Sequence, residues 1–220
     1  MTAYQILTRE GGNVVQAGHP TGCCAGRCRG RRWLRPAGTE PGNRAWQPQP
    51  TDGLQPGQST PGPYRREEFG NGWTQVRGNC DTREVVLETT AGPNAVDFDG
   101  DGCADDAPFL DVYTGLVINP NDADVDHVVS LADAWRSGAW EWTRAQRIRF
   151  ANDQGNLIAT LTSVNRDKGD DDPTQWAPPD PAGRCAYARI YRAAKQRWAL
   201  TLTPAQDQAL AGLQVGCPVQ

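Results

Sequence analysis

The chain has 220 residues, with 22 Lys and Arg against 26 Asp and Glu, which gives a formal net charge of −4. This length suits one domain with a real core plus appendages. The mild acidity excludes a global basic field for nucleic acid, so contact with a polyanion would need a bound cation and local basic patches. No apolar stretch approaches the length of a membrane span, and we expect no membrane contact.

Residues 1–62 are predicted to form a disordered, low-complexity tail. Gly, Pro, Arg, Gln and Thr dominate it, and such a composition cannot bury enough apolar surface to offset the ordering entropy. The segment after Met1 has no continuous apolar run typical of a signal peptide. The cysteines of this tail have no downstream His or Cys pair at zinc-finger spacing, so a zinc site is the weaker alternative: Cys23, Cys24 and Cys28.

Residues 63–218 have the patterns of a folded domain of short strands and helices. Asp81 and Glu84 have capping-box spacing, which predicts a short helix to position 87 or 88. Thr143 and Gln146 have the same spacing and predict a helix to about 151. The other predicted elements are short strands around a Thr-Gly turn in 108–118, strands over 125–129 and 157–161, and helices over 131–136, 162–167, about 185–198 and from 203 onward.

Four of the seven cysteines lie in this predicted domain, namely Cys80, Cys103, Cys185 and Cys217. An even number suits two disulfides and therefore a secreted protein. Of the three possible pairings we expect Cys80–Cys103 and Cys185–Cys217, each of which joins neighbours in sequence. The alternative is four reduced, buried thiols in a cytoplasmic protein, which agrees with the lack of a visible signal peptide.

Candidate catalytic groups lie in residues 124–129 (Asp-Val-Asp-His-Val-Val), at Asn156, and in residues 165–170 (Asn-Arg-Asp-Lys-Gly-Asp). His127 is the one histidine beyond position 19, so any imidazole mechanism in the predicted domain must use it. Phosphodiester hydrolysis requires an activated water, neutralised phosphorane charge and a stabilised leaving 3′-oxygen. A histidine base and one cation held by Asp and Asn oxygens meet these needs, and such hard ligands favour Mg²⁺ or Mn²⁺ over zinc.

These segments resemble the HNH, or ββα-metal, endonucleases, and are similar to the secreted HNH nucleases grouped with the GmrSD-type restriction endonuclease C-terminal domain. The resemblance covers about residues 64–217 and none of 1–62. It implies an α+β fold, with a ββα-metal core and flanking helices behind the disordered tail. It also implies a metal-dependent endonuclease, a hydrolase that uses one Mg²⁺ or Mn²⁺ to cut DNA, with RNA as an alternative substrate. We expect a monomer.

The resemblance also implies roles for individual residues: the general base His127, the metal ligands Asp126 and Asn165, the loop brace Asn156, the charge-offsetting Lys168, and the substrate-binding Arg166 and Arg83. Asp124 stays undecided. Two positions depart from the family pattern, with Ser130 where proline is frequent and Asp167 where serine is common. Asp167 adds a negative charge near the expected phosphate site.

Alternative functions belong to other classes. A secreted nucleic-acid-binding or scaffold domain would keep this fold without turnover. The run from Asp97 through Asp99 and Asp101 matches the first half of a calcium loop, but Pro108 replaces the closing Glu, so we expect a turn there and a calcium-stabilised adhesion module only as a third alternative. The predicted helix over 185–198 carries four basic residues and no acid. Such a face is usually solvated, and phosphate contact is its functional alternative.

Overall fold

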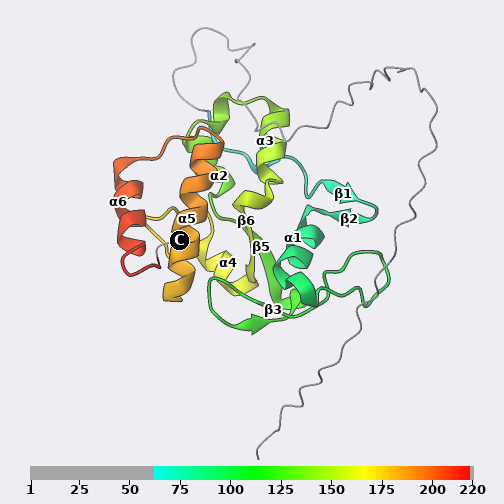
Figure 1. Ribbon diagram of the computed structural model, residues 1–220. Coiled ribbons are helices and arrows are strands. Elements are labelled where there is room, and N and C mark those ends of the chain that lie inside the picture. The colour runs from blue at the N-terminus through cyan, green and yellow to red at the C-terminus, as the bar shows by residue number, and fades with distance from the viewer. Residues whose placement is uncertain (1–61, 219–220) are drawn as a thin grey trace, which may run out of the picture. The chain divides into compact units, whose positions relative to one another are not determined.

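The computed structural model (Figure 1) describes residues 62–218 as a mixed α+β domain of small sheets and six α-helices. The α-helices are α1 (Thr82–Ala91), α2 (Leu131–Arg136), α3 (Arg144–Ala151), α4 (Thr162–Lys168), α5 (Pro181–Arg197) and α6 (Pro204–Leu213). The strands are β1 (Gln75–Arg77), β2 (Cys80–Asp81), β3 (Phe109–Leu110), β4 (Val117–Ile118), β5 (Ala123–His127) and β6 (Leu157–Leu161). The 3-10 turns are η1 (Arg66–Phe69), η2 (Gly92–Asn94), η3 (Pro120–Asp122), η4 (Ala139–Glu141) and η5 (Gln154–Asn156).

The predicted tail, except its last residue, lies outside the described residues, and so do Cys23, Cys24 and Cys28. Within residues 62–218 no helix is long and apolar enough to cross a membrane.

Capping side chains determine where the helices begin. The carboxylate of Asp81 accepts the first-turn amides of α1, and the side chain of Glu84 accepts the amide of Asp81 in return, which is the predicted capping box. The same reciprocal pattern opens α3 and α6. Helix α5 begins about four residues before the predicted start, because Asp180 caps it through the amide of Gly183 and Pro181 is the first helical residue.

The strands form three separate antiparallel pairs, β1–β2, β3–β4 and β5–β6. In the longest pair Ala123 lies opposite Leu161 and His127 lies opposite Leu157. The strand predicted over 125–129 is therefore displaced by two residues from β5, which spans Ala123–His127. Strand β5 ends at His127 because the residue opposite, Leu157, is the first of β6. Helices α1 and α4 pack on opposite faces of this hairpin (Figure 1).

Two apolar clusters form the core. The smaller one joins α1 to one face of the β5–β6 hairpin and includes Val86, Leu87 and Val125. The larger one joins η1, α2, α3, α5 and α6 around fully buried aromatic side chains such as Phe150 and Tyr191. The hairpin therefore lies between a helical bundle and α1, and its position is fixed from both sides.

The structure contains two disulfides, Cys80–Cys103 and Cys185–Cys217, in the pairing expected from the sequence. The first joins β2 to the loop before β3, and the second joins α5 to the segment after α6. Both lie outside the β5–β6 hairpin, so they stabilise the surrounding elements without contributing groups to it.

Reduction of these disulfides is expected to lower the free energy of unfolding by about 3–4 kcal/mol for each bond, because each closes a loop of intermediate length in the unfolded chain. The sequence separations are 23 and 32 residues. Urea unfolding with and without dithiothreitol measures the effect, with the Cys185→Ala/Cys217→Ala variant to separate the two bonds. An unchanged midpoint in dithiothreitol would contradict the expectation.

Candidate active site

The β5–β6 hairpin presents its polar side chains on two faces. Neighbouring residues of a strand point in opposite directions, so Asp124 and Asp126 lie on one face of β5 and Val125 and His127 on the other. The first face packs against α4 and also carries Thr160, which lies opposite Asp124. The second packs against α1. Asp126 and His127 are therefore adjacent in sequence but have different surroundings.

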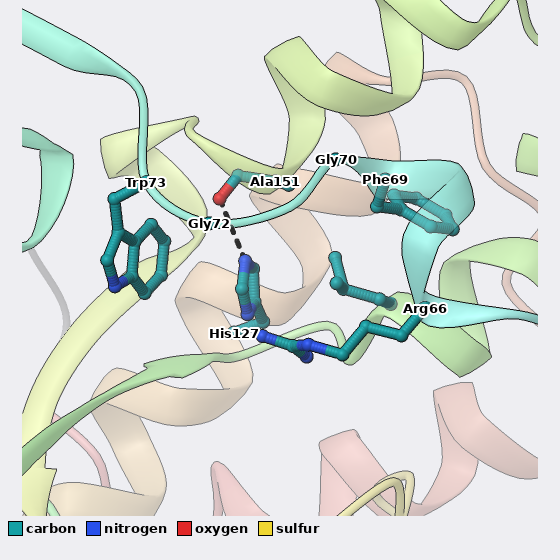
Figure 2. Close-up of a pocket in the computed structure, with 8 residues that line it drawn as sticks. Arg66, Phe69, Gly70, Gly72, Trp73, His127 and Ala151 are labelled. Atoms are coloured by element: carbon teal, nitrogen blue, oxygen red, sulfur yellow. Dashed lines mark hydrogen bonds between the residues drawn. The ribbon is translucent and has the colours of Figure 1, made fainter.

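His127 is buried and held in one orientation (Figure 2). Its Nε2 atom lies 2.8 Å from the carbonyl oxygen of Ala151, and the Trp73 ring stacks on the imidazole with a centroid distance of 5.4 Å and an interplanar angle of 18°. A carbonyl oxygen only accepts, so Nε2 donates the hydrogen bond. In the neutral imidazole the other nitrogen, Nδ1, then has no proton and can accept one.

Burial lowers the pKa of His127 from its usual 6.5 to about 4. The hydrogen bond to Ala151 and the charge of Asp126 oppose this shift, while the charges of Arg66 and Lys168 add to it. The imidazole is therefore neutral at pH 7, as a general base must be.

The His127 imidazole is expected to titrate near pH 4, which an NMR titration measures directly. The chain contains two histidines, so the His127→Asn spectrum assigns the resonances. Because the folded-state pKa lies below the unfolded one, this group stabilises the fold fully above about pH 6.5, and the contribution is lost as the pH falls toward 4. A titration midpoint near 6.5 would contradict the burial described here.

Asp126 has both carboxylate oxygens engaged. Lys168 Nζ lies 2.8 Å from Oδ1, and the hydroxyl of Tyr113 donates to Oδ2 at 2.9 Å. Lys168 also donates to the carbonyl oxygen of His127 at 2.8 Å. Burial, and then the charge of Asp126, raises the pKa of Tyr113 well above its usual range, which keeps its hydroxyl protonated as a donor. The carboxylate is thus buried, neutralised and fixed.

Asn165 lies beside Asp124. Its Nδ2 is 3.5 Å from Asp124 Oδ2, at the limit of a hydrogen bond, and within residues 62–218 neither side chain has another such partner. The buried Thr160 Oγ1 on the same face has no hydrogen-bond partner in that part of the chain either. Carboxylate, amide and hydroxyl oxygens of this kind are the ligands that Mg²⁺ and Mn²⁺ prefer, so this donor set fits a hard divalent cation.

Asn156 connects η5 to the end of β5. Its side chain is fully buried, its Oδ1 accepts the Val129 amide at 2.8 Å, and its Nδ2 donates to the Val129 carbonyl at 3.1 Å. Its own carbonyl oxygen accepts the amide of Val128 at 2.9 Å. These bonds connect the two residues after His127 to the residue just before β6.

The predicted substrate-binding arginines have different surroundings. Arg83 is half-buried and donates to the carbonyls of Pro120 and Ala123 at 3.5 and 3.3 Å, so it ties α1 to the start of β5. Arg166 is exposed on α4, directly after Asn165. The added acid Asp167 accepts the indole N–H of Trp176 at 3.0 Å, and this contact holds its charge at the surface of the domain.

The structure describes both regions for which the sequence left a binding alternative, the basic helix α5 and the calcium-like loop. The basic face of α5 is largely engaged within the domain, because Lys195 is buried against Asp133 at 2.8 Å and Arg192 pairs with Asp207. Arg197 pairs with Asp153 as well, so three of the four basic side chains in 185–198 have acidic partners within the domain. In the calcium-like loop the carboxylate of Asp97 accepts amides of its own loop, as expected for a turn.

Sequence reasoning missed Arg66, Trp73 and Tyr113. Trp73 covers His127, Tyr113 holds Asp126, and Arg66 lines the same cavity as His127. They come from segments before β1 and after β3, which carry no catalytic spacing relative to residues 124–129. The resemblance covers the segments of all three residues, which is the available signal, but it implies a role for none of them.

Comparison with known proteins places the same segments in a family. The family described as GmrSD restriction endonucleases, C-terminal domain, matches residues 98–213. The chain is also 40% identical over 157 residues to an uncharacterized secreted protein of Arthroderma benhamiae, an alignment that covers 70% of this chain and 76% of that protein. No solved structure matches the chain. The matched region contains β5, β6 and α4, whereas Arg66 and Trp73 precede it.

Proposed function

The chain belongs to the family of the GmrSD restriction endonucleases, C-terminal domain, and from this premise we propose that it is a divalent-cation-dependent endonuclease that hydrolyses phosphodiester bonds of DNA. The observation that carries the proposal is the state of His127. It is buried and neutral, its Nε2 is committed to the Ala151 carbonyl, and its Nδ1 is left to accept a proton. In this proposal β5, β6 and α4 form the ββα-metal core.

His127 acts as the general base. Its Nδ1 takes a proton from a water molecule as the water oxygen attacks the phosphorus, and the P–O3′ bond breaks on the opposite side. The departing 3′-oxygen is protonated from solvent, which completes the hydrolysis. Trp73 and the Ala151 carbonyl hold the imidazole in place, so that little reorganisation is needed during the step.

The α4 face of the hairpin supplies the proposed cation ligands Asp126 and Asn165, with Asp124 as a further oxygen donor beside Asn165. A bound Mg²⁺ or Mn²⁺ would supply positive charge that stabilises the phosphorane and the leaving oxygen. Lys168 orients Asp126 and adds a fixed positive charge on this face. Arg166, exposed next to Asn165, is proposed to contact the DNA backbone.

Incubation of plasmid DNA with the purified protein tests the proposal. We expect nicking and linearisation in Mg²⁺ or Mn²⁺, loss of cleavage in EDTA, and recovery when the metal is added back. RNA is assayed in parallel. Failure to cut DNA or RNA in any divalent metal would overturn the proposed activity.

A second candidate is a catalytically silent, secreted nucleic-acid-binding or scaffold domain. It is favoured by one observation, that both oxygens of Asp126 are already engaged by Lys168 and Tyr113. Metal-independent DNA binding without cleavage would support it, and cation-dependent cleavage would exclude it. For either function we propose an extracellular location, which two disulfides and the secreted relative support.

A further inference from the structure

A small cavity adjoins His127 (Figure 2). It is lined by the η1 turn, by the segment that leads to Trp73, and by Leu131 and Ala151. The volume that water molecules can occupy is about 50 Å³. One water molecule needs roughly 10–15 Å³. The cavity therefore has room for an attacking water beside the imidazole.

Arg66 is the cationic side chain of this cavity. Figure 2 shows it extending from η1 toward His127. Its neighbour Arg65 pairs with the glutamates of the same turn, whereas Arg66 forms no salt bridge with any acid of residues 62–218. Its polar neighbour is the hydroxyl of Tyr64. The positive charge beside His127 is thus not neutralised by a carboxylate of the described chain.

The turn that carries Arg66 is fixed in position. Phe69 is 2% exposed in the larger core cluster. Arg144 donates to the carbonyl of Glu67 at 2.9 Å, and Arg147 pairs with Glu68 at 3.0 Å. The base of the Arg66 side chain is therefore held by core packing and by two contacts to α3, which lowers the entropy cost of binding a ligand with it.

The segment after η1 returns the chain to His127. Gly70 and Gly72 have φ values of 102° and 137°, a backbone region that other residues rarely adopt. The two glycines let the chain bend back so that the Trp73 ring stacks on one face of the imidazole. The Arg66 side chain reaches the same cavity from η1. A water-sized space, the His127 imidazole and a cation that no carboxylate of the described residues neutralises are thereby brought together in one place.

We propose that Arg66 binds a non-bridging oxygen of the scissile phosphate and holds the phosphorus next to the water activated by His127, an inference that rests on the proposed function. A guanidinium is planar, permanently charged and matched to phosphate geometry. The charge of a bound phosphodiester would neutralise Arg66 beside the imidazole. The N-terminal segment, which precedes the part of the chain matched by the family, thus contributes a group to the active site.

The test compares Arg66→Gln and Arg66→Lys with Arg65→Gln, an exposed arginine of the adjacent position that already has glutamate partners. Steady-state cleavage gives kcat and KM, and fluorescence anisotropy in EDTA at low salt gives the Kd for a short DNA duplex. A lost charge-assisted hydrogen bond corresponds to about a 10- to 100-fold change. We expect that loss in kcat/KM and a raised Kd for Arg66→Gln, partial rescue for Arg66→Lys, and values within about twofold of wild type for Arg65→Gln.

The cleavage and binding assays together distinguish failure of the Arg66 inference from failure of the proposed function. If the wild-type protein cleaves and Arg66→Gln matches Arg65→Gln in both assays, the inference is overturned while the proposed function stands. If the wild-type protein never cleaves, the proposed function fails, and the Kd still decides the anion site: a raised Kd for Arg66→Gln supports it and an unchanged one overturns it. Absence of both cleavage and DNA binding by wild type overturns both. Urea unfolding of each variant excludes a general loss of structure as the cause of a difference.

Discussion

Replacement of His127 by Ala is expected to slow DNA cleavage on the order of 10²- to 10⁴-fold, because no other imidazole of the described residues can take the proton from water. Nicking of supercoiled plasmid at saturating Mg²⁺ measures the rate. The effect should appear mainly in kcat, since the base acts in the transition state more than in binding.

Loss of activity must be separated from loss of structure, because the imidazole is 8% exposed and stacks on Trp73. Urea unfolding of His127→Ala provides this control. Arg149→Gln, which changes an exposed residue of α3 away from the cavity, is the matched surface variant. A His127→Ala protein that cuts as fast as wild type would exclude the general-base mechanism.

Replacement of Lys168 by Met is expected to lower the free energy of unfolding by about 3–5 kcal/mol, since it leaves a buried carboxylate without its counter-charge. Lys168 is 1% exposed and lies 2.8 Å from Asp126. Chemical denaturation at pH 7 in EDTA measures the change without interference from bound cations.

A double variant tests whether the charge is the cause. Lys168→Met combined with Asp126→Asn removes both charges and keeps an acceptor for the Tyr113 hydroxyl. We expect it to regain a substantial part of the stability lost in Lys168→Met, because replacing both partners of a buried ion pair costs much less than replacing one. If the double variant is less stable than the single one, packing rather than charge explains the effect.

Local structure was largely predictable from sequence, whereas the contacts of the candidate site were only partly so. The capping boxes at Asp81 and Thr143 act on amides three residues away, so a short window contains the whole interaction. The end of β5 depends instead on its register with β6, and the prediction was wrong there by two residues. Neighbouring residues define a cap, but the partner strand defines the end of a strand.

Contacts in the candidate site join residues far apart in the sequence, and these were harder to predict than the local caps. Its three sequence segments are close in space as the resemblance implied, because β5, β6 and α4 form one unit. The contact between Lys168 and Asp126 joins residues 42 apart, and the hydroxyl of Tyr113 reaches the same carboxylate from another loop. The spacing of these residues does not indicate that Lys168 and Tyr113 bond both carboxylate oxygens of Asp126, nor that Asp124 lies beside Asn165. That outcome depends on how α4 packs on the hairpin.

The ammonium group of Lys168 bears on the order of folding and cation binding in the proposed nuclease. In domains whose metal ligands have no internal counter-charge, metal binding supplies the folding free energy and the metal-free chain is unfolded. Here a lysine that belongs to the chain neutralises the buried Asp126, and it also bonds the carbonyl of His127. The domain therefore needs no divalent cation to neutralise this carboxylate as it folds. If the proposed function holds, an incoming cation would compete with this ammonium for the carboxylate, so its concentration would control activity rather than folding.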